Sequence, residues 1–239
     1  MVTTSEYELA FGYPSDAFTA TVGAPFRMIF FKHSSLAIEV AGKYIYTDPV
    51  VDHADYDSLP KADLILISHH HYDHFEIEAV YKLMKQDTMI FCDATTAGIL
   101  AEHGIDCSTV RPGISIKPLP FLRLETLPAY NYSEGRTNFH PKNREDVGYI
   151  IGFGGVRIYI AGDGENTPEM KAAPNIDIAL LPVNQPYTMT VDQAVDAVKA
   201  IRPRIFYPYH YGQVEEQTDL ERLQRELEGI CEVRIRGME

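Results

Sequence analysis

The most informative segment of the chain reads Leu64-Ile65-Leu66-Ile67-Ser68-His69-His70-His71-Tyr72-Asp73-His74. It begins as a short apolar run that is typical of a buried strand, and it then places four of the nine histidines within six residues. While the backbone stays extended, His69 and His71 point to one side of the strand and His70 points to the other. The spacing H-x-H-x-D-H therefore predicts that His69 and His71 hold one metal ion and that His70 faces away from it.

Asp73 and His74 follow where the chain turns toward the next helix. There they can face a second ion about 3.5–4 Å from the first, and Asp73 can also cap the first amides of the helix. The simpler explanations are a polar loop or tag remnant, and a single structural metal site. Tags lie at chain termini and carry no aspartate between their histidines, and structural zinc sites usually close with cysteines, none of which neighbours a histidine here. Catalytic use of metal is therefore favoured.

Short strands and helices alternate on both sides of this segment. Amphipathic helices are predicted over residues 77–84 and 94–102 and from residues 190 and 218 onward. Strands are predicted at residues 27–31, 36–40, 44–47, 64–67, 88–91, 114–117, 121–127, 147–153, 156–161, 176–183, 204–207 and 231–235. Because strands are followed by helices twice over, two sheets would bury their apolar faces best by packing on each other. The predicted fold class is α+β, a four-layer αββα sandwich of two mixed β-sheets with helices on both outer faces.

Local turn and capping signals fix several of these boundaries. Gly154-Gly155 separates two apolar runs, which is the signature of a two-residue hairpin that tolerates positive φ. Thr190 with Gln193, and Thr218 with Glu221, have the spacing of capping boxes. We therefore expect a hairpin at residues 154–155 and helix starts at Thr190 and Thr218.

The composition describes one globular domain that covers residues 1–239. The 239 residues are 45% hydrophobic and 23% charged, and we find no internal repeat and no Pro/Gly/Ser-rich linker. No apolar run approaches the ~20 residues that span a bilayer, and the start of the chain lacks the basic and apolar stretches of a signal peptide. We expect a cytoplasmic protein with no membrane partner.

The charge balance and the cysteines narrow the class of partner. The formal net charge of −13 is spread along the chain, and such a surface repels phosphate backbones, so nucleic acid is a poor partner. Cys92, Cys107 and Cys231 are an odd number without CxxC spacing, and we interpret them as reduced thiols. The expected partner is a small-molecule substrate, and the oligomeric state is left open.

The H-x-H-x-D-H motif resembles the first signature of the metallo-β-lactamase superfamily of dinuclear metallohydrolases. Two further features occur in the order that this superfamily shows: the turn Ala161-Gly162-Asp163-Gly164 after a hairpin strand, and the late strand end Pro208-Tyr209-His210-Tyr211-Gly212. The resemblance covers residues 33–212. Within the superfamily the sequence is most similar to the branch of ascorbate-phosphate lactonase-like proteins and an N-acyl-phosphatidylethanolamine phospholipase D.

The resemblance implies two divalent ions, with zinc favoured and manganese, iron or nickel as alternatives. It implies that His69 and His71 bind the first ion and that Asp73 and His74 bind the second. These four ligands all lie within the motif that carries the resemblance.

The remaining ligands are implied by the later motifs. Asp163 would bridge both ions, and His210 would complete the second site. The superfamily usually supplies a third histidine for the first ion in a phrase like P-x-x-H, but this sequence has Asn131 at that place. We nominate His140 over Asn131 because imidazole suits zinc, iron or nickel better than an amide oxygen does. If neither coordinates, the protein would hold only one ion tightly.

Other polar residues have more ordinary expectations. His53 and His103 lie in polar surroundings and are taken as surface groups, whereas His33 at a strand end is a candidate for orienting a ligand. Asp48 before a proline is either a turn residue or a hydrogen-bond partner of a ligand histidine. Glu165 and Glu169 could line the pocket, but we favour their interpretation as acidic residues at a helix entrance.

The expected reaction is hydrolysis, with catalytic roles for Asp163 and Asp73. Two ions bridged by Asp163 would lower the pKa of a shared water toward ~7, and the resulting metal-bound hydroxide would attack a lactone, ester or amide. Asp73 would orient that nucleophile and take up its proton. Alternatives on the same ligands are a phosphodiesterase and an iron-dependent redox enzyme; a non-catalytic metal-binding module ranks last.

Overall fold

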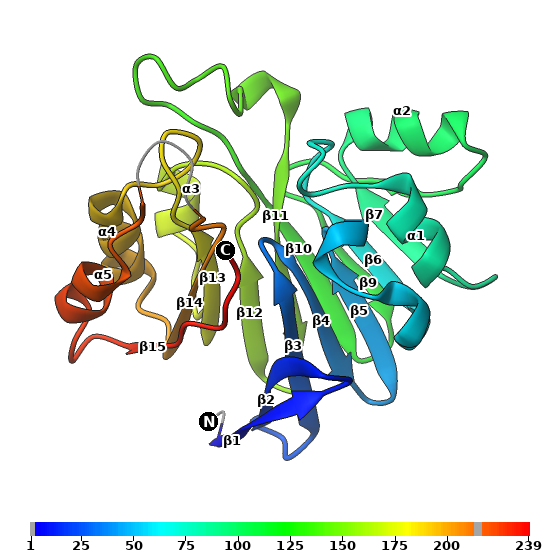
Figure 1. Cartoon of the computed structure of the whole chain (residues 1–239), viewed down its shortest axis with the longest axis horizontal. Helices are drawn as coiled ribbons and strands as arrows, with labels where there is room; N and C mark the ends of the chain where they lie inside the picture. The colour runs from blue at the N-terminus through cyan, green and yellow to red at the C-terminus, as the bar shows by residue number, and fades with distance from the viewer. Residues whose placement is uncertain (1–2, 213–216) are drawn as a thin grey trace. The chain divides into compact units, whose positions relative to one another are not determined.

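The computed structural model describes residues 3–212 and 217–239, and it contains two mixed β-sheets with helices (Figure 1). The chain groups into two compact units. Unit 1 comprises residues 1–110 and 153–156, and unit 2 comprises residues 111–152 and 157–239. The expectation of one domain over residues 1–239 stays a prediction.

Unit 1 is built on an eight-stranded sheet whose strands follow one another in chain order. The strands from β1 to β5 pair antiparallel, and those from β5 to β8 pair parallel. The strands are β1 (Thr3–Ala10), β2 (Tyr13–Thr19), β3 (Pro25–Lys32), β4 (Ser35–Val40), β5 (Lys43–Thr47), β6 (Leu64–Ile67), β7 (Met89–Cys92) and β8 (Ser108–Thr109).

Helices provide the crossovers that parallel strands require. The helix α1 (Ile77–Leu83) connects β6 to β7, and α2 (Ala94–Glu102) connects β7 to β8. Both pack on the sheet through an apolar cluster that includes Ile65, Val80 and Leu100. Short 3-10 turns cover Val51–His53 and Tyr56–Ser58.

The helix α1 begins differently from the prediction. Its N-cap residue is Glu76, whose side chain makes no capping hydrogen bond, so Asp73 does not cap α1. The turn after the histidine motif is instead closed by backbone bonds, because the N–H groups of His74 and Phe75 both donate to the carbonyl of His71 at 2.9 Å. Asp73 is thereby available for other contacts.

Unit 2 is built on a seven-stranded sheet in the order β15-β14-β13-β12-β11-β10-β9. The pairs between β12 and β15 are parallel, whereas β9 and β10 pair antiparallel. The strands are β9 (Ser115–Leu119), β10 (Leu122–Pro128), β11 (Val147–Phe153), β12 (Val156–Ile160), β13 (Ile178–Pro182), β14 (Ile205–Tyr209) and β15 (Glu232–Val233). The strand predicted at residues 231–235 is thus shorter than expected. Gly154 and Gly155 have φ values of 54° and 79°, which confirms the two-residue hairpin.

The helices of unit 2 are α3 (Pro168–Lys171), α4 (Val191–Ile201) and α5 (Leu220–Glu226), with a 3-10 turn at Lys142–Arg144. The capping box of Thr190 and Gln193 at the start of α4 is confirmed. The second expected box is wrong, because Asp219 caps α5 by accepting from the Arg222 N–H. The Thr218 hydroxyl donates instead to the carbonyl of Val183 at 2.5 Å.

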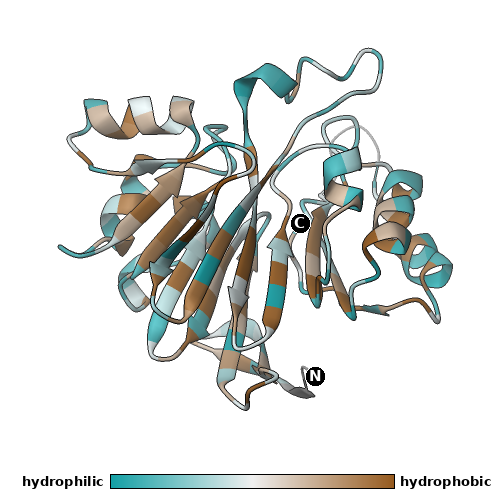
Figure 2. Ribbon diagram, turned by 180° about the vertical axis from the view of Figure 1, so that it is seen from behind, coloured by the Kyte–Doolittle hydropathy of each residue, from teal (hydrophilic) through white to brown (hydrophobic). Residues whose placement is uncertain are grey.

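Each sheet has its own apolar core. In unit 2 the buried cluster joins the inner face of α4, with Val195 and Val198, to strand residues such as Leu181 and Phe206. Figure 2 shows that the strands carry much of the hydrophobic colouring, whereas the connecting loops are mainly hydrophilic. Within the described residues, no helix is both long and apolar enough to cross a membrane.

Three of the described strands, β1, β2 and the two-residue β8, and the short helix α3 were not predicted. Pro14 and Asp16 lie within β2, and both residue types are depleted in strands, so propensity gave no signal there. The β1–β2 hairpin forms nevertheless, because β2 pairs with β3 and extends the sheet. The four-residue α3 is too short for a periodic pattern to predict it.

Candidate metal centre

In unit 1 the chain is held in place where β5 and β6 end. Thr47 is the register partner of Leu66, so these parallel strands present their carboxyl ends side by side. Asp48 follows directly with φ 42°, and its carboxylate accepts from the N–H and from the hydroxyl of Ser68, both at 2.7 Å. One buried carboxylate therefore fixes the residue that precedes the histidine motif.

The same carboxylate orients a histidine of the motif. Asp48 Oδ2 lies 2.8 Å from His74 Nδ1, and both side chains are buried. A carboxylate at this position accepts the Nδ1 proton and leaves the Nε2 lone pair for a metal ion. Of the two interpretations of Asp48, the structure thus shows the contact with a histidine of the motif, whose role as a metal ligand stays a prediction.

Three imidazoles of the motif converge within unit 1. The ring centroid of His69 lies 4.5 Å from that of His71 and 4.2 Å from that of His74. His69 has a possible ligand nitrogen within 4.8 Å of one on each of the other two. Ser68 Oγ is 3.0 Å from His69 Nδ1, which favours Nε2 as its ligand atom. His70 is half-buried beside His71, with centroids 5.1 Å apart, and its orientation away from metal stays a prediction.

The carboxylate of Asp73 contacts the ring of His33. His33 Nε2 lies 3.3 Å from Asp73 Oδ2, and both side chains are half-buried. Ligand atoms of His33, Asp73 and His74 lie within 4.8 Å of one another. The expected role of His33 as an orienting residue is therefore supported by a direct contact with a carboxylate of the motif.

The expectation for His53 was wrong. Its Nδ1 is 2.7 Å from the Ser35 hydroxyl, and its ring lies beside that of His33, with centroids 5.6 Å apart. Burial, together with the neighbouring imidazole of His33, lowers the pKa of His53 to about 3, so the ring is neutral at pH 7. His103 is exposed, as expected.

In unit 2 the turn after β12 places Asp163. Gly162 has φ 66°, and the Tyr209 hydroxyl donates to its carbonyl at 3.0 Å. Gly164 approaches the neighbouring loop so closely that a Cβ there would lie 2.6 Å from Tyr130 N. The G-D-G sequence is therefore required by backbone packing as well as by the carboxylate it carries.

Asp163 lies between two buried histidines. Its Oδ2 is 3.1 Å from His210 Nε2 and 3.4 Å from His140 Nε2, and all three side chains are at most 4% exposed. His210 follows β14 with φ 51°, and its N–H donates to the Met238 carbonyl at 2.9 Å. Two imidazole nitrogens thus face one carboxylate oxygen, which is the arrangement expected around a metal ligand set.

Asn131 lies in the loop that also holds His140. The Asn131 N–H donates to the His140 carbonyl, and its side-chain amide donates to the Tyr187 carbonyl, both at 2.8 Å. The hydrogen bond to Tyr187 uses the amide nitrogen of Asn131 and not the oxygen that would coordinate a metal. The His140 ring faces Asp163 at 3.4 Å, and this contact favours His140, although its role as a ligand stays a prediction.

A buried ion pair that the sequence did not reveal supports the His140 loop. Glu165 is fully buried, accepts from the N–H groups of Tyr132 and Ser133 at 2.7 and 2.8 Å, and pairs with Arg136 at 2.8 Å. Burial raises the pKa of Glu165, but the hydrogen bonds from the backbone of Tyr132 and Ser133 and from the side chains of Ser133 and Gln193 outweigh burial and hold the pKa below its usual value. The helix-entrance interpretation was wrong for Glu165, because α3 starts at Pro168 and is capped by Thr167, but Glu169 lies in the first turn of α3 as expected.

Arg136 extends this support to a second loop. Its guanidinium donates to the carbonyls of Pro186 and Thr188 and, at 3.4 Å, to Gln193 Oε1. The loop that carries His140 is thereby tied to residues 186–188 and to the start of α4. No sequence spacing predicts contacts between residues about fifty positions apart.

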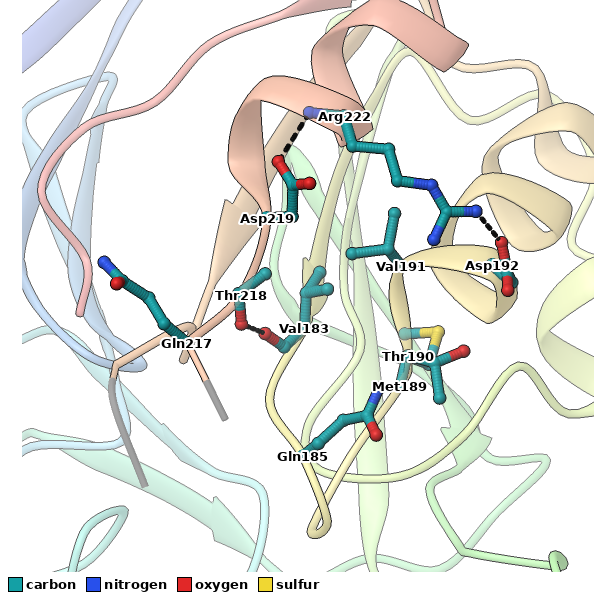
Figure 3. Close-up of a pocket in the computed structure, with 10 residues that line it drawn as sticks. All are labelled: Val183, Gln185, Met189, Thr190, Val191, Asp192, Gln217, Thr218, Asp219 and Arg222. Atoms are coloured by element: carbon teal, nitrogen blue, oxygen red, sulfur yellow. Dashed lines mark hydrogen bonds and ion pairs between the residues drawn. The ribbon is translucent and has the colours of Figure 1, made fainter. Parts of the chain in front are cut away.

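A cavity of about 250 Å³ opens beside the loop after β13 (Figure 3). The Val183 N–H donates to the Tyr209 carbonyl at 3.1 Å, so this wall is attached directly to the strand end that carries His210. Arg222 contributes an ion pair with Asp192, and Thr218 donates to the Val183 carbonyl. The cavity is lined by Val183, Gln185, Met189, Thr190, Val191, Asp192, Gln217, Thr218, Asp219 and Arg222.

Comparison with known proteins defines the class. Residues 27–210 match the beta-lactamase superfamily domain, a span that includes every predicted metal ligand. A UPF0173 metal-dependent hydrolase from Flavobacterium johnsoniae is 31% identical over 195 residues, which cover 77% of this chain and 84% of that protein. Another UPF0173 metal-dependent hydrolase, from Thermoplasma acidophilum, is 32% identical, and the matched residues cover 78% of this chain and 83% of that protein. The chain belongs to the UPF0173 metal-dependent hydrolase family of the metallo-β-lactamase superfamily.

Solved structures agree with this assignment. A candidate metal-dependent hydrolase from Parabacteroides distasonis matches with a TM-score of 0.88 and 40% identity, covering 95% of this chain and all of that one. Igni18, a metallo hydrolase from Ignicoccus hospitalis, matches with a TM-score of 0.74 and 27% identity, covering 87% of this chain and 93% of that one. These similarities confirm the predicted αββα fold class, and the family confirms that the protein is a metal-dependent hydrolase.

Proposed function

We propose that this hydrolase cleaves a lactone, ester or amide of a small molecule at a centre for two divalent cations, with zinc as the first choice. The observation that carries the proposal is the buried contact of Asp163 Oδ2 with Nε2 of both His140 and His210, at 3.4 and 3.1 Å. Buried ionisable groups of this kind are costly unless they are paired or coordinate a metal.

The proposed ligands follow the superfamily resemblance. Asp163, the carboxylate that two histidines of unit 2 face, would help to hold both ions. His69, His71 and His140 would hold the first ion, and Asp73, His74 and His210 would hold the second. This assignment is supported by the convergence of the motif histidines within unit 1 and by the position of His140 in unit 2.

The donor set suits a borderline-soft divalent cation. Neutral imidazole and carboxylate are ligands of zinc, and manganese, iron and nickel bind the same groups. Asp48 fixes the tautomer of His74, and Ser68 approaches Nδ1 of His69, so both histidines can offer Nε2. Such outer contacts commonly accompany metal-ligating histidines.

The residues have separate tasks in the proposed hydrolysis. Bound divalent cations would supply a water of pKa near ~7 and polarise the carbonyl under attack. Asp163 would keep His140 and His210 oriented, and Asp73 would hold the proton released from the attacking water. His33 would keep Asp73 Oδ2 in position through its 3.3 Å contact.

The charge of the chain favours a small molecule over a polyanion as substrate. A net charge of −13 disfavours polyanions, so we propose neither nucleic acid nor a membrane as partner. We also propose a cytoplasmic location, because the three cysteines lack the spacing of a disulfide framework. The cavity of about 250 Å³ beside the His210 strand end is of a size for part of a small molecule. Within the superfamily we propose a relationship to the ascorbate-phosphate lactonase-like branch, which agrees with a lactone as substrate.

The test combines metal analysis with a substrate panel. Protein purified without chelators should contain two divalent ions per chain and hydrolyse at least one lactone, ester or amide. Asp163→Asn should lose metal and activity, whereas the exposed control His103→Ala should retain both. Activity confined to bis-aryl phosphates would contradict the proposed substrate class, and redox-active iron with oxygen consumption would contradict hydrolysis itself.

A further inference from the structure

Two of the three cysteines lie in contact within unit 1. Cys92 Sγ is 3.7 Å from Cys107 Sγ, although the residues are 15 positions apart in the sequence. Cys92 ends β7 and is fully buried, whereas Cys107 directly precedes β8 and is half-buried. The parallel pairing of β7 with β8, in which Thr109 is the register partner of Cys92, brings the two thiols together.

We propose that Cys92 and Cys107 form a redox modification site, at which a hydroperoxide converts the two thiols into a reversible intramolecular disulfide. A disulfide has an S–S distance of about 2.0 Å, so the sulfurs must approach by about 1.7 Å. A change of that size is within reach of side-chain rotation at the half-buried Cys107. Cys231 is part of a different apolar cluster, in unit 2, and serves as an internal reference.

The chemistry balances with the hydroperoxide as the only oxidant. The sulfur of Cys107 attacks one oxygen of the hydroperoxide, the O–O bond breaks, and Cys107 becomes a sulfenic acid, while the other oxygen takes up the thiol proton and leaves as an alcohol, or as water when the oxidant is hydrogen peroxide. The Cys92 sulfur then attacks the Cys107 sulfur, the S–O bond breaks, and the hydroxyl group leaves with the Cys92 proton as water while the disulfide forms. The two thiols lose two electrons in total, and the peroxide gains them.

The roles of the two cysteines follow from their environments. Burial raises the pKa of the Cys92 thiol, so Cys92 is a poor first nucleophile. Cys107 is the more accessible sulfur and meets the oxidant first. Cys92 is in contact with it and resolves the sulfenic acid before further oxidation can occur.

The disulfide would lie one strand away from the histidine motif. Ile67 is the register partner of Cys92, and the motif begins immediately after Ile67. The new bond would close the segment that contains α2 and tether β7 to the start of β8. Closure of such a loop restricts the unfolded chain, so the oxidised protein should melt at a higher temperature than the reduced protein.

Thiol titration of the intact chain tests the proposal. After exposure to hydrogen peroxide and removal of the excess, the unfolded protein should show one reactive thiol in place of three, and dithiothreitol should restore all three. A peptide map without reduction should contain a cross-linked pair that carries Cys92 and Cys107. The variant Cys231→Ser, which retains Cys92 and Cys107, should lose both titratable thiols after the peroxide treatment. The variant Cys107→Ser, which retains Cys92 and Cys231, should keep both thiols after a brief peroxide treatment.

Several outcomes would overturn the proposal. These are three titratable thiols after oxidation, a disulfide that includes Cys231 or joins two chains, or a sulfinic acid on Cys107 as the main product. Because Cys92→Ser could disturb the core, Cys92→Ala provides the second test. In this variant Cys107 should oxidise to higher acids, since no resolving thiol is present.

Discussion

His74 Nδ1 and Asp48 Oδ2 lie 2.8 Å apart, and each side chain is almost completely buried. The aspartate leaves β5 and the histidine belongs to the motif after β6, so the pair joins two adjacent parallel strand ends. Asp48 also holds the backbone and hydroxyl of Ser68. Orientation of the His74 ring and anchoring of its loop therefore depend on the same carboxylate.

Replacement of Asp48 by asparagine should weaken metal binding more than folding. Asparagine tolerates the left-handed backbone at this position but cannot accept from His74 and Ser68 with a full negative charge. We expect metal affinity to fall about 10–100-fold, as measured by competition with a chromophoric chelator. The exposed Asp52→Asn is the matched control, and equal affinities for the two variants would contradict the proposed role.

Asp163→Ala should lose most of the bound metal and all activity while the protein remains folded. The buried apolar clusters of both units are made without any contribution from this side chain. Elemental analysis should show the metal loss, and a circular-dichroism melt should remain cooperative. Collapse of the melt in this variant would mean that the ions, rather than apolar packing, stabilise the fold.

Arg136→Ala should destabilise the protein and loosen the His140 loop. Removal of the guanidinium leaves the buried carboxylate of Glu165 without its cationic partner, and breaking such a pair costs about 3–5 kcal/mol. Urea unfolding measures the free-energy change, and chelator competition measures the effect on metal binding. Arg123→Ala, on the exposed part of β10, is the control and should change unfolding by less than about 1 kcal/mol.

Asp63 should make stability depend on pH on the acid side. Burial raises its pKa, but Lys85 at 2.7 Å, Lys43 at 2.9 Å and the Tyr44 N–H outweigh burial and lower the pKa below 3.8. Since the folded pKa is depressed, the stabilisation is complete above the unfolded value of 3.8 and is lost as the pH falls through the folded value.

The measurement is urea unfolding of wild type and Asp63→Asn between about pH 3 and pH 7. At pH 7 the variant should be less stable by about 1–3 kcal/mol, and the difference should shrink toward low pH. Asp57→Asn, at an exposed position, should show no such convergence. A constant difference across the pH range would show that ionisation of Asp63 contributes nothing.

The sequence predicted those parts of the fold that have strong local periodicity. The apolar run of β6, the glycine pair of the β11–β12 hairpin and the Thr190 capping box each carry their signal within a few residues. The β2 strand carries Pro14 and a buried Asp16, so its local signal opposes its structure. The segment nevertheless forms a strand, because it pairs with β3 and extends the sheet.

The candidate site was predictable only in part for a similar reason. Strand alternation was enough to nominate His69 and His71 as metal ligands, whereas Asp163 and His210 were nominated through the superfamily resemblance. The pair of Arg136 and Glu165 joins segments with no common motif, and a single sequence contains no record of that contact. The possible roles of Asp48 could be reduced to two, because a residue before proline at a strand end has few possible roles.

The predicted ligands and their partners follow strand ends in both sheets: Asp48 after β5, the histidine motif after β6, Asp163 after β12 and His210 after β14. Protein engineering can use the separation of these strand-end residues from the loop that follows β13. Libraries confined to residues 185–189, of which Gln185 and Met189 line the cavity, would leave the predicted ligands at the strand ends unchanged. Arg136 should be kept fixed in such libraries, because it fastens that variable loop.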